Sequence, residues 1–249
     1  MKREPASVDP ANDEPCSLLK WDSEFFGFPI ARVNAQTITD ASARVIDNFC
    51  QQNAVRLIYF LARSDVPETT RAAGHAGFNL VDIRLTFERS NLPSGEFPQD
   101  IRPVSPNDYA ALEEIAATAH TDTRFYFDGH MPRQKCNDLY RCWIRRSCEG
   151  WAQMVFVTGP GGSPTGYVTC HANPQTAGGS IGLIAVRADS RDAGLAGKLV
   201  TASLTWFSQQ GLKTASVVTQ GRNISAQRLY QHNQFVTRSL ELYYHKWYG

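Results

Sequence analysis

The stretch that decides the fold lies between Ser180 and Thr219 and reads SIGLIAVRADSRDAGLAGKLVTASLTWFSQQGLKTASVVT. Its first seven residues, Ser180–Val186, are almost all apolar, as expected for a strand with both faces covered. A helix is predicted from about Asp192 to Gln210, and Ala215–Thr219 is a second apolar strand. The helix places apolar residues on one face, at Leu195, Leu199, Ala202 and Trp206. A strand, helix and strand of this length predict a parallel, right-handed crossover unit.

The turn before this helix, Arg191–Gly197, is rich in small residues that let a ligand approach the backbone closely. The first N–H groups of a helix are unpaired and carry the positive end of its dipole, so the turn suits a pyrophosphate. A Walker loop is excluded because Gly197-Lys198 is followed by Leu199 instead of Ser or Thr, and the turn contains no Gly-x-Gly-x-x-Gly. The turn alone is also compatible with close packing of the helix on the sheet.

A further helix is predicted from Asn223, a favourable capping residue, to about Asn233. Asn223, Ala226, Tyr230 and Asn233 lie on one face of it, since seven residues make nearly two turns. Strand, small-residue turn, helix, strand and Asn-x-x-Ala-x-x-Leu-Tyr, in this order, resemble the acetyl-CoA-binding half of the GCN5-related N-acetyltransferase (GNAT) superfamily. The last helix ends in Gln234-Phe235, where that superfamily usually has Gly-Phe.

This resemblance implies that the strand equivalent to Ile181–Val186 splays from its neighbour, so that pantetheine pairs with its backbone, and that the turn wraps the pyrophosphate. It also implies that Tyr230 stands beside the thioester sulfur. The implied cofactor-binding residues are Ile184, Ala185, Val186, Arg191, Gly194, Leu195, Ala196, Gly197 and Asn223. Acetyl-CoA is the expected cosubstrate. No metal is expected, because His120, His130 and His171 lack metal-ligand spacing.

A narrower resemblance covers most of the chain. It is carried, in order, by WDSEFFG at residues 21–27, Gly77-Phe78-x-Leu80-Val81-Asp82, Arg124-Phe125, Trp143-Ile144 and Ile181-Gly182-Leu183-Ile184-Ala185. These segments look like those of the bacterial dTDP-fucosamine acetyltransferases, which acetylate the 4-amino group of a nucleotide-linked deoxysugar for surface-polysaccharide synthesis. The expected fold is therefore α/β: a GNAT fold whose mixed central sheet has splayed strands, preceded by a degenerate half-unit of the same fold.

An internal echo agrees with two related units. Strand, helix, Gly77-Phe78 and strand in the first half resemble strand, helix, Gln234-Phe235 and strand in the second. The expected organisation is a tail over residues 1–15, the half-unit over 16–90, a linker over 91–100 and the acetyltransferase domain over 101–249. The remaining predicted helices cover residues 39–53, 105–119 and 139–147 and a segment that starts at Pro67, and the remaining strands cover 55–62, 80–88, 154–158, 166–171 and 235–247.

Amide formation needs a neutral amine, a polarised thioester carbonyl and a protonated leaving thiol. Backbone N–H groups near Ile184–Val186 are candidate oxyanion donors. Tyr230 is the candidate acid, because a thiol titrates at about 8.5 and a tyrosine at about 10, so the transfer costs only about 2 kcal/mol. The sugar acetyltransferases carry an acidic residue at the position of Asp82, which makes Asp82 the candidate base, acting through water. The alternatives are a Tyr230 that only packs in the core and an Asp82 that faces solvent.

Charge and composition narrow the classes of partner. The 25 Lys+Arg and 24 Asp+Glu residues leave a formal net charge of +1, and the densest basic run, Arg141–Arg146, is interrupted by uncharged residues. No nucleic-acid or anionic-membrane partner is therefore expected. No run approaches the roughly 18 apolar residues of a membrane span, and the first residues do not form a signal peptide. Six cysteines without a Cys-x-x-Cys pair are expected to be free thiols in the cytoplasm.

The predicted function is transfer of acetyl from acetyl-CoA to a small-molecule primary amine, with a nucleotide-linked 4-amino-4,6-dideoxysugar as the favoured acceptor. The alternatives are another amine, such as a peptide, polyamine or antibiotic, and a non-catalytic module that senses acetyl-CoA. The near-neutral charge offers no acidic attraction for a polyamine. Arg124 is a candidate for contact with a nucleotide phosphate. The ending over residues 243–248 is expected to be a strand that packs or pairs, and it is a candidate for a homodimer seam.

Overall fold

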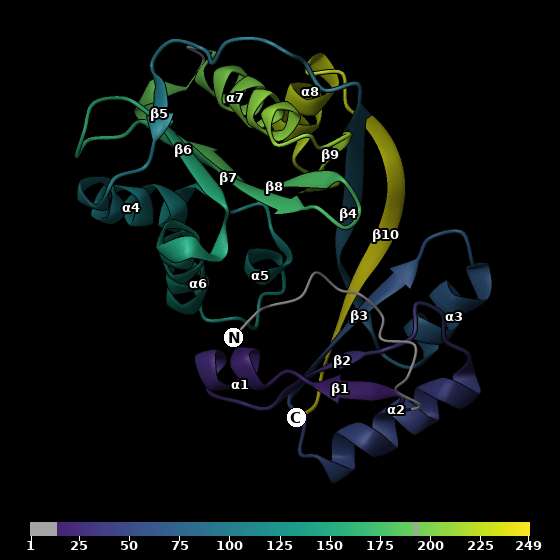
Figure 1. Ribbon diagram of the computed structural model, residues 1–249. Helices are drawn as coiled ribbons and strands as arrows, with labels where there is room; N and C mark the ends of the chain where they lie inside the picture. Colours follow the sequence, from purple (N-terminus) through teal and green to yellow (C-terminus); the bar gives the residue numbers. More distant parts are fainter. Residues whose placement is uncertain (1–13, 192–193) are drawn as a thin grey trace. The chain divides into compact units, whose positions relative to one another are not determined.

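The computed structural model describes residues 14–191 and 194–249, which form two compact units (Figure 1). The first unit contains the chain up to Arg84 together with Leu240–Gly249, and the second contains Leu85–Ser239. The contacts thus group the last ten residues with the first unit, whereas the expected half-unit and domain, residues 16–90 and 101–249, are both contiguous. Most of the expected tail, residues 1–13, lies outside the described residues.

Strands and helices alternate in the first unit. Its complete elements are β1 (Cys16–Leu18), α1 (Lys20–Phe26), β2 (Ile30–Val33), α2 (Asp40–Gln52), β3 (Leu57–Arg63) and α3 (Pro67–His75). β4 (Asn79–Ser90) begins in this unit, and β10 (Val236–Trp247) ends in it. The strand order is β1-β2-β3-β10, with β2 and β3 parallel and the outer two pairs antiparallel. The helices and strands predicted between residues 39 and 88 are confirmed, with bounds that differ by at most a few residues.

Helix α2 shows why these residues form these elements. Thr39 accepts a hydrogen bond from the Ser42 amide, the Ser42 hydroxyl accepts one from the Thr39 amide, and together they close a capping box. The helix then turns Ala43, Ile46 and Cys50 into the core of the first unit. The predicted ending is confirmed as a strand that pairs, because residues 241–247 of β10 run antiparallel to β3 within the same chain.

The second unit contains residues 180–219, the strand, helix and strand that decide the fold. Its complete elements are β5 (Ile101–Pro103), α4 (Tyr109–Ala119), α5 (Arg124–Phe127), α6 (Arg133–Arg146), η2 (Ser147–Trp151), β6 (Met154–Thr158), β7 (Gly166–Asn173), β8 (Gly178–Val186), α7 (Leu195–Gln209), β9 (Thr214–Gln220) and α8 (Ile224–His232), with short 3-10 turns at Pro106–Asp108 and Ala188–Ser190. β8 and β9 are parallel, and β5 to β8 are antiparallel, in the order β9-β8-β7-β6-β5. The predicted mixed α/β fold and the parallel crossover through α7 are confirmed.

Helices cover both faces of this sheet, α7 on one and α4 and α6 on the other (Figure 1). On the α7 face, a Cβ atom on Gly179 would lie 2.6 Å from the Phe207 ring, and the Cys170 thiol donates to the Ser203 hydroxyl at 3.3 Å. The glycine therefore allows α7 to pack directly on β8. On the opposite face, Tyr167 of β7 is completely buried.

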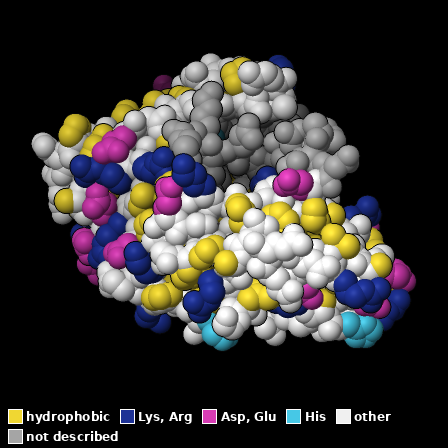
Figure 2. Space-filling model, turned by 90° about the horizontal axis from the view of Figure 1, so that it is seen from below, with side chains coloured by type: hydrophobic (Ala, Val, Ile, Leu, Met, Phe, Trp, Pro, Cys, Tyr) yellow, Lys and Arg dark blue, Asp and Glu magenta, His cyan; other side chains and the backbone are white. Residues whose placement is uncertain are grey.

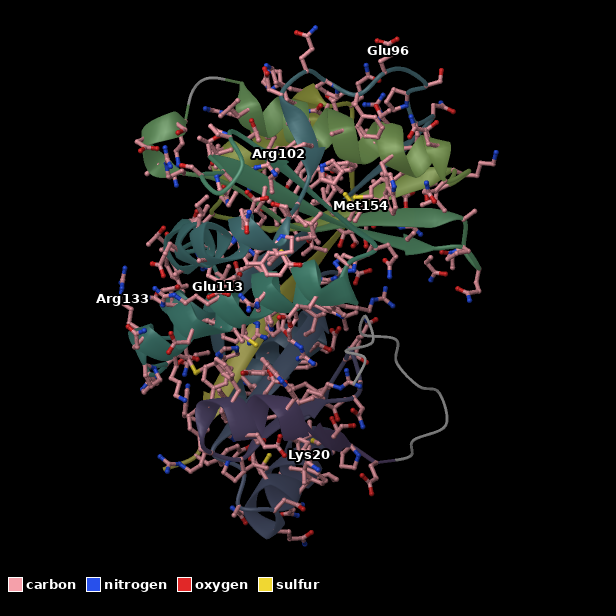
Figure 3. The ribbon with its side chains drawn as sticks, turned by 60° about the vertical axis from the view of Figure 1, so that its left-hand side comes forward. Lys20, Glu96, Arg102, Glu113, Arg133 and Met154 are labelled. Carbon is pink, nitrogen blue, oxygen red and sulfur yellow. The ribbon has the colours of Figure 1, made fainter. Side chains whose placement is uncertain are left out.

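Asp108, at the start of α4, ties three segments of the second unit together. The Arg102 guanidinium on β5 (Figure 3) donates to both of its carboxylate oxygens, at 2.7 and 2.9 Å. The Gly162 amide in the turn between β6 and β7 donates to the same carboxylate at 2.9 Å. These bonds hold the pKa of the fully buried Asp108 carboxyl well below its usual range, with the Arg102 bond the largest cause.

Two helix boundaries differ from the prediction. The described part of α7 begins at Leu195, not near Asp192, because Gly194 has a left-handed backbone (φ 70°) that no helical residue adopts. Asp192 itself lies outside the described residues. α6 begins at Arg133, six residues before the predicted start, because its first two turns are almost entirely polar and give no apolar periodicity.

The internal echo is confirmed at the level of backbone geometry. α3 ends with Gly77 at φ 77°, and the Phe78 amide donates to the Ala73 carbonyl at 2.9 Å. α8 ends with Gln234 at φ 61°, and the Phe235 amide donates to the Tyr230 carbonyl at 3.0 Å. Both helices thus end in the same left-handed cap, followed by a buried phenylalanine. Gln234 occupies this cap without the freedom of glycine, at a steric cost of about 1–2 kcal/mol.

We expect Gln234→Gly to raise the free energy of unfolding by about 0.5–1 kcal/mol, since relief of the left-handed strain outweighs the greater entropy of glycine in the unfolded chain. Denaturant titration measures the change. Gly77→Gln is the matched control, because it introduces the same strain at the equivalent cap and should destabilise the protein. Stabilisation by Gly77→Gln, or loss of stability in Gln234→Gly, would contradict the shared geometry.

Candidate functional site

β8 and β9 part halfway along their length. Their described pairs run from Gly178 with Thr214 to Ile181 with Val217. Beyond this point β9 continues to Gln220, while β8 continues to Val186 in contact with β7 on its other side. The splayed strand implied by the resemblance is therefore present.

A β-bulge in β8 accounts for the parting. Gly182 and Leu183 together oppose the single residue Thr169 of β7, and the Leu183 amide donates to the Thr169 hydroxyl at 2.8 Å. The bulge is bracketed by two regular pairs, Val168 with Ile184 and Cys170 with Ile181. A bulge bends its own strand and increases the local twist, so the second half of β8 turns away from β9.

The bulge also decides which backbone groups of β8 face the opened side. The Leu183 and Arg187 amides donate towards β7, to the Thr169 hydroxyl and to the Thr165 carbonyl. Since successive residues of a strand direct their N–H and C=O groups to alternate edges, Ala185 also points to β7. Ile184 and Val186 then present their amides and carbonyls on the side of β9. Of the three residues proposed on β8, these two have backbone groups placed for a ligand.

The start of α7 offers three further amides. The Lys198 amide donates to the Gly194 carbonyl at 3.2 Å, which is the first bond of the helix, and no side chain caps it. Leu195, Ala196 and Gly197 therefore have no carbonyl acceptor within the helix. Their amides carry the positive end of the helix dipole and suit an anion. Arg191 is exposed just before this turn; residues 192 and 193 of the predicted loop lie outside the described residues.

The glycines of this turn are not needed for packing within the protein. A Cβ atom on Gly194 or Gly197 would meet open space, with no heavy atom of the described part of the chain within 4 Å, apart from the helix itself and the neighbouring residues. Close packing of the helix on the sheet, the alternative left open by the sequence, therefore does not explain these two positions. The backbone is instead accessible from outside, as a pyrophosphate would require.

Asn223 and Tyr230 have different environments: the first caps α8, and the second is buried in the core. The Asn223 side chain accepts from the Ala226 amide at 3.0 Å and thus caps the helix, as predicted. Tyr230 is only 2% exposed, and its ring packs between Phe87 and Phe235, with centroid distances of 5.9 and 5.8 Å. Burial raises the pKa of Tyr230, so its hydroxyl keeps its proton at neutral pH.

Asp82 belongs to the first unit, whereas Tyr230 belongs to the second. Asp82 is 5% exposed on β4, and its carboxylate accepts from the Ile83 amide at 2.9 Å. The alternative that Asp82 faces solvent is wrong. A base role for this residue stays a prediction.

Three polar residues on the α4–α6 face, His120, Tyr140 and Tyr167, were not predicted as a group from the sequence, because they lie on separate segments. His120 follows α4, stacks on Tyr140 of α6 with a centroid distance of 4.7 Å, and lies 2.8 Å from the Tyr167 hydroxyl through Nε2. Burial lowers the pKa of His120 to about 4.

Arg124, the candidate for a phosphate contact, is buried, with its guanidinium 3.9 Å from the centre of the Phe125 ring. Contact of Arg124 with a nucleotide phosphate stays a prediction.

Arginines of the basic run Arg141–Arg146, which is not expected to bind nucleic acid, form ion pairs with carboxylates. Arg141 pairs with Glu114 at 3.1 Å, and Arg145 pairs with Glu113 at 3.0 Å and with Glu149 at 2.7 Å. The face in Figure 2 likewise shows Lys and Arg side chains among Asp and Glu side chains. All six cysteines are free thiols. Within residues 14–191 and 194–249 we found no cluster of three or more metal-ligating side chains and no helix with the length and apolarity of a bilayer span.

Comparison with known proteins agrees with this geometry. The model of the acetyltransferase (GNAT) family matches residues 109–235, just over half of the chain. The spore coat polysaccharide biosynthesis protein SpsD of Bacillus subtilis is 27% identical over 150 residues, which cover 60% of this chain and 51% of that protein. The chain thus spans about half the length of this curated relative.

Two solved structures show the same fold along nearly the whole chain. A GCN5-related N-acetyltransferase from Sphaerobacter thermophilus is 14% identical with a TM-score of 0.65, over 93% of this chain and 76% of the other. A conserved protein of unknown function from Staphylococcus epidermidis is 14% identical with a TM-score of 0.63, over 96% and 95% of the two chains. At these identities the likeness concerns the fold alone.

We expect Gly197→Ala to stabilise the protein by up to about 1 kcal/mol, because alanine favours the helix and its methyl group meets no neighbour. The same methyl group should weaken acetyl-CoA binding about tenfold, since it would stand at the helix start where the pyrophosphate is predicted to bind. Thermal unfolding and calorimetric titration measure the two effects. Gly74→Ala in α3, where space is equally open, is the control and should stabilise without changing affinity. Unchanged affinity in Gly197→Ala would place the ligand elsewhere.

Proposed function

Because the chain belongs to the acetyltransferase (GNAT) family, whose members are acetyl-CoA-dependent N-acetyltransferases, we propose that it transfers acetyl from acetyl-CoA to the amine of a nucleotide-linked 4-amino-4,6-dideoxysugar. The product would serve surface-polysaccharide synthesis. The observation that carries the proposal is the parting of β8 from β9 at the bulge, next to a helix start with free amides. We further propose that the reaction takes place in the cytoplasm.

The pantetheine arm would lie along the opened edge of β8, paired with the backbone of Ile184 and Val186. The pyrophosphate would accept hydrogen bonds from the amides of residues 195–197, with Arg191 beside it. Asn223 and Ala185 would contact acetyl-CoA less directly. The Asn223 side chain is already occupied in capping α8, and the Ala185 backbone faces β7.

The sugar acceptor is supported by two independent likenesses. The relative SpsD is named for polysaccharide biosynthesis, and the segments quoted from residues 21–27, 77–82 and 181–185 resemble those of dTDP-fucosamine acetyltransferases. The near-neutral net charge of +1 offers no overall electrostatic attraction for a polyamine. Other amines, and a sensor that binds acetyl-CoA without turnover, are outcomes of the test below, as is a homodimer.

In the proposed mechanism, the Ile184 amide polarises the thioester carbonyl and stabilises the oxyanion of the tetrahedral intermediate. Tyr230 donates its phenolic proton to the departing CoA sulfur. Asp82 is the candidate proposed from the sequence for removing a proton from the acceptor, through water. Holding the amine against the carbonyl supplies a large part of the acceleration, since it converts a bimolecular attack into an oriented one.

We expect Tyr230→Phe to keep its affinity for acetyl-CoA while kcat falls by about tenfold or more, because only the proton donor is lost and the ring still fills its place between Phe87 and Phe235. Steady-state kinetics and calorimetry separate the two quantities. Tyr126→Phe removes another tyrosine hydroxyl of the second unit and serves as the control. An unchanged kcat in Tyr230→Phe would remove the residue from the mechanism.

The function itself is tested with the pure protein, acetyl-CoA and a panel of amines that includes dTDP- and UDP-linked 4-amino sugars, with free CoA thiol as the readout. Calorimetry with CoA and acetyl-CoA comes first. Heat with both, and thiol release that depends on a 4-amino sugar, supports the proposal. Heat without thiol release from any amine favours the sensor, and absence of heat overturns the assignment of the site. Light scattering of the same sample reports the oligomeric state.

A further inference from the structure

His171 lies at the point where β8 leaves β9. It belongs to β7 and pairs with Ser180 of β8, one residue before Ile181, where the described β8–β9 pairs end. A Cβ atom on Gly182 would stand 2.7 Å from His171 Nε2 and 3.0 Å from its Cδ2. The Nε2 edge of the imidazole is therefore directed at the bulge, and glycine at position 182 leaves room for it.

The imidazole is held from its other side. The Trp151 ring of η2 packs against it edge-on, with a centroid distance of 5.3 Å and an interplanar angle of 67°. Hydrogen bonding with the Trp151 backbone also favours the protonated form of the ring. The half-buried His171 thus has a fixed direction, as a group that exchanges protons with a substrate requires.

The reacting atoms would lie within reach of this ring. Ile184, the candidate oxyanion donor, is two residues beyond Gly182, and at about 3.3 Å per residue their separation along the strand is about 7 Å. Residues 167, 169 and 171 of β7 share the face opposite α7, because α7 covers the alternate residues Gly166 and Cys170. An amine that approached the thioester from this face would therefore share that face with His171.

We propose that His171 accepts, through Nε2, the proton that the acceptor ammonium loses before it attacks acetyl-CoA. The inference rests on the proposed function and gives His171 the role that the sequence analysis gave to Asp82. The proton moves from R–NH3+ to Nε2 and then to solvent. The neutral nitrogen forms a bond to the carbonyl carbon, the C–S bond breaks, the sulfur takes a proton from Tyr230, and the second nitrogen proton restores the phenol. The ammonium form of the acceptor and acetyl-CoA thus yield amide, CoA thiol and one proton.

The charge state of His171 agrees with this role. Burial lowers the pKa of His171, although the bond to Trp151 opposes the shift, so the ring is neutral at pH 7 and able to accept a proton. The ionisable groups on this face include His120, Tyr140, Tyr167, Cys148 and Glu149, and Arg124, Tyr126 and Cys136 lie near Tyr140; β6 and β8 contain no ionisable residue.

His120, Cys148, Tyr140 and Tyr167 should not titrate in the same range as His171. The pKa of His120 is about 4, and burial raises the pKa of Cys148 to about 12 and also raises those of both tyrosines. Glu149 pairs with Arg145 at 2.7 Å. The rate should therefore rise with pH as His171 loses its proton, in an acid limb at or below the ordinary histidine pKa of about 6.5.

The test compares kcat/KM against pH for the wild type, His171→Gln, His120→Gln and Asp82→Asn, with an amine that the wild type acetylates. His171→Gln should lower kcat/KM at pH 7 about a hundredfold, abolish the acid limb and leave acetyl-CoA affinity within about twofold. His120→Gln should keep the limb. The loss in His171→Gln should shrink with an acceptor that is already neutral at the assay pH, such as methoxyamine, which a purely structural role would not produce.

A second measurement does not need an acceptor. In protein labelled with nitrogen-15 histidine, acetyl-CoA should shift the Nε2 resonance of His171, and Gly182→Ala should shift it without ligand, because the added methyl group meets the ring. An acid limb that survives in His171→Gln but disappears in Asp82→Asn overturns the inference and leaves the proposed function standing. Calorimetric heat with an unmoved His171 resonance does the same. Absence of heat overturns both.

Discussion

One extra residue in β8 sets the geometry of the second unit. At Gly182–Leu183 the buried hydroxyl of Thr169 takes the place of a backbone acceptor, and the strand bends away from β9. The described pairing of β8 with β9, which would otherwise occupy the backbone groups along this edge of β8, ends at Ile181. A sheet interior is usually closed to ligands because each backbone group is already bonded. Here the bulge leaves a short length of edge in the middle of a sheet, and the strand leads to the start of α7, which no side chain caps.

Much of the fold could be predicted from local patterns. The apolar run before the Arg191–Gly197 turn, the amphipathic helix after it and the capping asparagine at position 223 each depend on neighbours in the sequence. The bulge could not be predicted in this way, because its stabilising hydroxyl comes from Thr169 on another strand. Gly182 was the available signal, since glycine inside an apolar strand often marks a bulge.

The candidate site was harder to foresee for the same reason. Tyr230 could be identified from its spacing, but the environment of its hydroxyl comes from Phe87 and Phe235, and burial there makes it a weaker acid than a free tyrosine. A thiolate held in the same apolar surroundings is also destabilised. The difference between the pKa of Tyr230 and the pKa of the CoA thiol therefore changes less than either pKa alone. The proton transfer from Tyr230 to the thiolate stays feasible. His171 lies in a predicted strand, but the direction of its ring depends on Trp151, which belongs to another element.

The division of the chain has a consequence for synthesis on the ribosome. The second unit is complete once Ser239 has emerged, whereas the first still lacks its fourth strand, because residues 241–247 pair with β3. Residues 14–84 must therefore wait for residues 240–249, with one edge of β3 uncovered in the meantime. Exposed strand edges invite pairing with other chains. The nascent first unit should consequently depend on chaperones until residues 241–247 have emerged.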